Sequence, residues 1–305
     1  MKDRWVYWML LVFYGGGAVR EVVTKLALES FSPGFVSSLT SMIAVLSVML
    51  YFWIRRPCYR AAAEKENWSV EVLMWMVVLS VFTAGAVHFG NVSIDRVGPL
   101  SYKLVHVTVY PVSLSFLAFV LLRERMSRQV VISTVIALVG FYVFYAGQFT
   151  NLALGWPGLF AGVVSSLSYA VSLLIIKHLL SQNIIPEKIV AARFLLLSLG
   201  TIFVMPATAM ELTLRSGFLL LLLGVLGYAG LFTMFFYGVK DIPATTVNVF
   251  VASTPLFSAF FTWLLLPDVH FTALEMIGLW IIIFALGYMW FVKDETGCTL
   301  PTGGR

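Results

Sequence analysis

Ten apolar segments, each about 20 to 26 residues long, follow one another along this chain. A helix of that length crosses the roughly 30 Å hydrocarbon core of a bilayer. Charged residues make up 11% of the sequence, against about 25% in soluble domains. The sequence therefore predicts an all-α integral membrane protein with ten transmembrane helices. The predicted helices are 5–28, 33–54, 70–90, 97–122, 128–147, 155–180, 186–208, 217–238, 243–266 and 271–292.

One spacing of proline and acidic residues occurs twice in the chain. Pro111 precedes Glu124 by thirteen residues, and Pro255 precedes Asp268 by the same interval. Two copies of a hydrophobic unit are typical of carriers whose binding site lies between the halves. A second pair of prolines, each seven residues before a polar residue, repeats in the same way: Pro33 with Thr40, and Pro186 with Arg193.

The duplication predicts two five-helix domains, at residues 1–150 and 151–295, followed by a cytoplasmic tail at 296–305. Because five is odd, the second repeat is expected to be inverted relative to the first. With the N-terminus inside, 14 of the 20 lysines and arginines fall in inner segments and two in outer loops. This bias predicts that both termini are cytoplasmic, in a plasma membrane. It also accounts for the net charge of +5 without any role for nucleic acid.

The region from Pro111 to Ser127 resembles the end of an EamA-type domain of the drug/metabolite transporter superfamily. In that family a proline-containing helix ends in Leu-Gly-Glu, and here Arg123-Glu124 stands in place of Gly-Glu. The resemblance spans about residues 5–292. It implies ten helices around a central cavity and a carrier of small metabolites that works by alternating access. The matching positions elsewhere are Gly140, Ser168 to Lys177, Pro186 to Leu196, Pro255, Leu266, Asp268, Gly278 and Gly287.

Charged residues of the predicted helix 5–28 fall on one face. Arg20, Glu21 and Lys25 share a side of the helix, opposite an apolar side that suits lipid. A charge in hydrocarbon costs at least about 2.5–3.5 kcal/mol on insertion scales, so this face should meet protein or water. Glu21 and Lys25 are four residues apart and can form an ion pair. Arg20 or Lys25 then faces the substrate, or the pair is structural and Lys25 reaches the outer surface.

The predicted helix 97–122 holds the strongest candidate site. Lys103, His106 and Tyr110 share one face, with Tyr102 next to them. The neighbouring Pro111 removes a backbone hydrogen bond and leaves a carbonyl free. We therefore expect these side chains to bind substrate. In the alternative interpretation, Lys103 reaches the outer interface and His106 bonds a neighbouring helix.

Other helices supply further candidates. Tyr169 and Asn248 each lie on a face of small and polar residues, so we expect both to contact substrate. Pro255 is expected to break the second copy's helix as Pro111 breaks the first. Candidates for gating or proton transfer, each of which could instead be structural, are Glu21, His88 and Arg193.

The embedded charges predict the kind of substrate. Arg20, Lys25, Lys103 and Arg193 are embedded in the predicted helices away from their charged inner ends, whereas Glu21 is the one clearly embedded acid. We therefore expect an anionic or zwitterionic molecule such as an amino acid or organic acid. The predicted function is secondary transport, most simply export, with proton coupling through Glu21 or a histidine left open. The alternatives are a sugar-phosphate or nucleotide-sugar antiporter, a channel, and a scaffold without transport activity. Val107 stands where sugar-phosphate translocators carry lysine, which disfavours that subgroup.

The sequence lacks the motifs expected of an intramembrane enzyme. It contains no His-Glu-x-x-His, no Gly-x-Ser-x-Gly and no cysteine pair with metal-ligand spacing. We therefore predict no catalytic residues, no metal and no cofactor.

Overall fold

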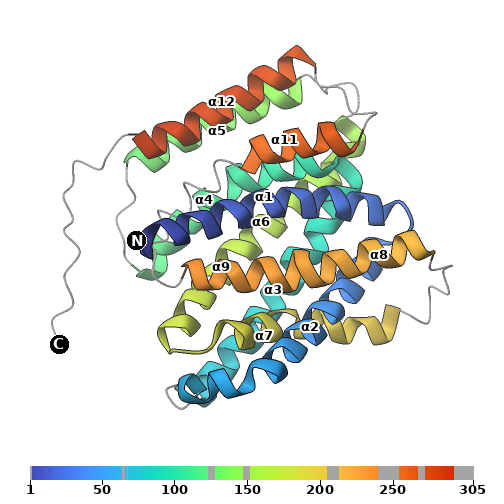
Figure 1. Ribbon diagram of the computed structural model, residues 1–305. Helices are drawn as coiled ribbons and strands as arrows, with labels where there is room; N and C mark the ends of the chain where they lie inside the picture. The colour runs from blue at the N-terminus through green and yellow to red at the C-terminus, as the bar shows by residue number, and fades with distance from the viewer. Residues whose placement is uncertain are drawn as a thin grey trace.

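The computed structural model describes residues 2–63, 66, 68–122, 128–146, 152–204, 213–239, 254–266 and 272–291, and every element within these ranges is a helix (Figure 1). The first half contains α1 (Lys2–Leu28), α2 (Pro33–Ala63), α3 (Val70–Val97), α4 (Pro99–Leu122) and α5 (Arg128–Ala146). The second half contains α6 (Leu152–Ser181), α7 (Pro186–Val204), α8 (Leu214–Leu222), the π-helix η3 (Leu223–Gly230), α9 (Leu231–Val239), α11 (Thr254–Leu265) and α12 (Ala273–Phe291).

The expected helical architecture is confirmed for the described residues, and helix occurs in each of the ten predicted segments. Among the described residues, four spans are long and apolar enough to cross a membrane, namely Pro33–Ile54, Val70–Val97, Gly155–Ser181 and Leu214–Val239. The last of these joins α8, η3 and α9. Ten membrane crossings therefore remain a prediction.

Helix α3 continues to Val97, beyond the predicted end at residue 90, and this continuation contains polar residues. Asn91 is buried and donates its side-chain Nδ2–H to the Ser37 hydroxyl of α2 at 2.9 Å, so its polarity is satisfied inside the protein. The helix ends at Gly98, whose φ of 82° suits glycine and whose N–H donates to the carbonyl of Ile94 at 3.0 Å. Pro99 then opens α4 with a φ already fixed for a helix. This turn sets Lys103 about one helical turn into α4.

Several of the main helix–helix contacts join a helix of one half to a helix of the other half. Helices at the same position in the two halves are partners: α2 packs against α7, α4 against α11, and α5 against α12. Between different positions, α3 packs on α6 as the α8–η3–α9 helix packs on α1. Figure 1 shows α5 and α12 side by side at one edge and α2 and α7 at the opposite edge, with α1, α4 and α6 between them. Such pairing of corresponding helices is expected when two copies of a unit are related by an approximate two-fold axis.

Glycines allow close contacts between helices at two places. A Cβ atom on Gly278 of α12 would lie 2.6 Å from the Gly140 carbonyl oxygen of α5, so neither backbone leaves space for a side chain. In η3, a Cβ on Gly227 would lie 2.9 Å from Cγ of Arg20. The absence of a side chain at Gly227 therefore leaves room for Arg20 of α1 beside the π-helix.

Candidate functional site

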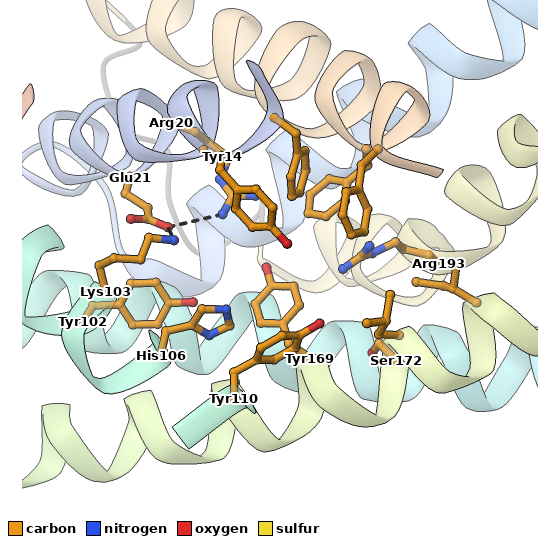
Figure 2. Close-up of a pocket in the computed structure, with 16 residues that line it drawn as sticks. Tyr14, Arg20, Glu21, Tyr102, Lys103, His106, Tyr110, Tyr169, Ser172 and Arg193 are labelled. Carbon is orange, nitrogen blue, oxygen red and sulfur yellow. Dashed lines mark ion pairs between the residues drawn. The ribbon is translucent and has the colours of Figure 1, made fainter. Parts of the chain in front are cut away.

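A cavity lies at the centre of the bundle, bounded by α1, α4, α6, α7 and α9. Its water-accessible space is about 70 Å³, enough for several water molecules. Aromatic rings form much of the wall, and charged side chains enter it from both ends (Figure 2). The aromatic lining consists of Phe13, Tyr14, Tyr102, Tyr110, Tyr169, Phe232 and Phe235.

One end of the cavity holds a buried cluster of two cations and one acid. Lys103 Nζ lies 2.6 Å from Glu21 Oε1, and an Arg20 nitrogen lies 3.6 Å from the same oxygen. The Glu21 side chain is 1% exposed and that of Lys103 is 8% exposed, so water screens this pair little. Figure 2 shows Arg20, Glu21 and Lys103 together on one side of the cavity. The carboxylate of Glu21 is therefore the counterion both of Lys103 on α4 and of Arg20 on its own helix, α1.

The expected pair of Glu21 and Lys25 is not formed. Lys25 Nζ instead donates to the backbone carbonyl of Asp95 at 2.8 Å and lies 3.9 Å from the Asp95 carboxylate. The reason is tertiary: α4 brings Lys103 to Glu21, while Lys25, one turn further along α1, reaches the end of α3. Lys25 does not line the cavity, and its side chain is 29% exposed. Lys25 therefore contacts the end of α3 rather than the cavity, and its part in substrate binding stays a prediction.

The opposite end of the cavity is formed by Arg193 of α7, which is 2% exposed. Its guanidinium carbon lies 4.0 Å from the centre of the Phe232 ring and 5.6 Å from that of Tyr169. Within the described part of the chain, no carboxylate pairs with Arg193, and its Nε and Nη2 have no hydrogen-bond acceptor. Aromatic faces offset part of the cost of burying this charge, but its N–H donors remain unused.

The hydrogen bonds of α4 fix two side chains of the wall. Ser166 donates its hydroxyl proton to the Gly162 carbonyl at 2.7 Å, so His106 Nδ1, 3.2 Å from Ser166 Oγ, must be the donor in that contact. Nδ1 of His106 therefore carries a proton. Ser165 likewise donates to a carbonyl, that of Ala86, at 2.7 Å, so Tyr102 donates its hydroxyl to Ser165 Oγ at 3.2 Å.

Rings hold His106 in place from two sides. Tyr110 stacks on it with ring centres 5.0 Å apart, and Tyr169 meets it edge-on at 5.4 Å. The side of the cavity that α4 and α6 form is thus rigid and partly polar.

Most of the predicted binding residues converge on this one cavity. The structure brings together Arg20, Glu21, Tyr102, Lys103, His106, Tyr110, Tyr169 and Arg193. It does not bring in His88, which is half-buried on α3 with its ring 5.5 Å from that of Phe89. Asn248 lies outside the described residues, as do Glu124 and Asp268. Both prolines are buried: Pro111 lies inside α4, and Pro255 is the second residue of α11.

Phe232 and Phe235 also line the cavity, and no sequence pattern predicted them. They lie three residues apart on α9, on a face that Val239 continues, so no polar neighbour marks the face that points inward. In the structure Phe13 stacks on Phe235 at 4.2 Å, and Phe232 lies under Arg193. Their spacing of three shows only that they share a helical face.

Comparison with known proteins gives the chain a family. The model of the EamA-like transporter family matches residues 4–146 and 156–291. The chain belongs to this family. Its members are membrane transporters rather than enzymes, so the chain is a multi-pass membrane transporter of the drug/metabolite type.

No curated protein matches this EamA-like transporter. Comparison with solved structures supports its fold. A solved structure, described only as a crystal structure of protein, has 14% sequence identity and a TM-score of 0.67. The match covers 95% of this chain and 98% of the other. At this identity the two proteins share an architecture, and the site must be argued from this chain's own residues.

Proposed function

We propose that this EamA-like transporter is a secondary transporter of a small organic anion that carries a carboxylate. The observation that supports this most strongly is Arg193 in the cavity wall, whose guanidinium Nε and Nη2 have no hydrogen-bond acceptor among the described residues. A buried charge without a partner is costly. A carboxylate can accept two parallel N–H donors from a guanidinium, so a substrate of this class would supply the missing acceptor.

The charge of the cavity favours the same class of substrate. Within the described residues, Arg20, Lys103 and Arg193 line the cavity, and Glu21 is the one carboxylate among them. The surplus is positive, and the low dielectric of a membrane interior strengthens its attraction for an anion. Neutral groups beside the cations, the Tyr110 hydroxyl among them, can hydrogen-bond the rest of the molecule.

We also propose how the protein is arranged in its membrane. The two halves, residues 1–150 and 151–295, form inverted five-helix repeats that rock about the central cavity in alternating access. The pairing of corresponding helices between the halves supports a two-fold relation. The lysine and arginine bias supports cytoplasmic termini, including the tail at 296–305, in a plasma membrane. The net direction of transport is proposed to be outward, and uptake into inside-out vesicles tests it.

The proposal is tested by transport in proteoliposomes. Purified protein is reconstituted, loaded with unlabelled malonate, lactate or serine, and assayed for counterflow of the same labelled compound. We expect saturable counterflow of at least one carboxylate and none of neutral malonamide. Counterflow also separates a carrier from a channel, which cannot accumulate label against an unlabelled pool.

A matched pair of variants connects that activity to the site. Arg193→Gln removes the cation from the cavity, whereas Arg215→Gln removes an exposed arginine of α8. Arg193→Gln should lose counterflow at least tenfold, and Arg215→Gln should retain it, with both variants eluting as single peaks in detergent. Equal transport by Arg193→Gln and wild type would remove Arg193 from the binding site and overturn the proposal.

A further inference from the structure

The two ends of the cavity hold different charged groups, and this difference narrows the class of organic anion that the protein is proposed to transport. At one end, Glu21 is shared between Lys103 at 2.6 Å and Arg20 at 3.6 Å. One negative charge there faces two positive ones. At the other end, Arg193 faces only aromatic rings among the described residues. Each end therefore keeps about one positive charge that protein groups do not balance.

The carboxylate of Glu21 already has two protein cations beside it, Lys103 and Arg20. Its oxygens are as buried as Nε and Nη2 of Arg193, so the charge count, and not burial, distinguishes the two ends. A substrate ammonium at Glu21 would become a third cation beside Lys103 and Arg20, and like charges in a poorly solvated site repel strongly. Within the described lining, a zwitterion thus meets an unpaired cation for its carboxylate at Arg193, but no carboxylate without protein cations for its ammonium.

The two unbalanced charges lie at separate places. Figure 2 shows Arg193 on one side of the cavity and Lys103 with Arg20 on the other, with His106 and Tyr110 on the wall between them. A single anionic group beside Arg193 leaves the other end unbalanced. Two anionic groups in one molecule would balance the charge at both ends.

We infer that the substrate is an organic dianion with two separated anionic groups, such as a short dicarboxylate, and that zwitterionic amino acids are discriminated against. This rests on the proposed function, because it takes the cavity as the transport site. The Lys103–Glu21–Arg20 cluster acts here as the specificity-determining element: it binds a second anionic group and excludes an ammonium.

Four compounds with the same number of non-hydrogen atoms separate charge from size. At neutral pH malonate is a dianion, malonamate a monoanion, malonamide neutral and serine a zwitterion. Binding of each to the purified full-length protein in detergent is measured by calorimetric titration. Malonate is expected to bind at least about tenfold more tightly than malonamate, because an added unit charge facing a cation in a poorly solvated site changes affinity by that order or more. Serine is expected to bind no more tightly than malonamate.

Two further arms test the positions of the charges. Inorganic phosphate carries its charge on one group, so it should bind more weakly than malonate; tighter binding of phosphate would contradict two separated sites. Glu21→Gln frees Lys103 and Arg20, and should keep or increase the preference for malonate over serine. Loss of serine binding in Glu21→Gln, after tight serine binding in wild type, would show that Glu21 receives an ammonium group.

Different binding results contradict the dianionic substrate and the transport of carboxylates. Serine that binds wild type as tightly as malonate overturns the dianion and leaves a carboxylate carrier in place. Malonamide that binds as tightly as malonate, or malonate binding that survives Arg193→Gln unchanged, contradicts the anion carrier itself.

Discussion

Removing the ammonium of Lys103 leaves the carboxylate of Glu21 buried with Arg20 as its remaining cation, at 3.6 Å. The Lys103–Glu21 distance of 2.6 Å and the 1% exposure of Glu21 show that this pair is a buried salt bridge. Removing one partner of a buried salt bridge is costly, because the other charge stays buried. We therefore expect Lys103→Met to lower the free energy of unfolding by about 3–5 kcal/mol. The double variant Glu21→Gln, Lys103→Met removes both charges and should recover most of that loss.

The assay is reversible unfolding of the purified protein in mixed micelles as the fraction of SDS rises, followed by circular dichroism. Lys25→Met is the matched control, because Lys25 is 29% exposed and bonds mainly a backbone carbonyl. Its loss should stay below about 1.5 kcal/mol. A Lys103→Met variant within about 1 kcal/mol of wild type, or a double variant no more stable than the single one, would refute the reasoning.

Three other variants test separate features of the structure. Arg193→Lys keeps the charge but not the planar donor pair, so counterflow should fall about tenfold, and full activity would show that charge alone suffices. Gly278→Ala puts a Cβ against the backbone of α5 and should cost about 1–3 kcal/mol in the same unfolding assay, whereas Gly217→Ala, with open space around it, should cost far less. Gly227→Ala displaces Arg20 and should weaken malonate binding in calorimetry; unchanged affinity would argue that the position of Arg20 beside η3 does not matter.

Helical periodicity predicts which residues share a face, and several residues of the polar faces of α1 and α4 line the cavity, although Lys25 does not. Arg20 with Glu21 on α1, and Tyr102, Lys103, His106 on α4, meet in one cavity as their spacing suggested. A period of 3.6 residues contains this information locally. The same period carries no information on faces that are apolar throughout, such as the one that holds Phe232 on α9.

Partners across helices could not be predicted from local spacing. Glu21 has a lysine four residues away in sequence and another on α4, and only the packing of α1 beside α4 decides between them. The sequence placed Arg193 among the candidates for gating or a structural role. The structure puts its guanidinium in the cavity wall against Phe232, a contact between α7 and α9 that no motif in the chain marks.

A structure of the wild-type protein with bound malonate is the most direct test of the anionic site. One carboxylate should lie within hydrogen-bond distance of Arg193 Nε and Nη2, and the other should lie beside Lys103 and Arg20. Malonate bound elsewhere, or an Arg193 guanidinium paired with a protein carboxylate while the cavity holds no anion, would contradict it.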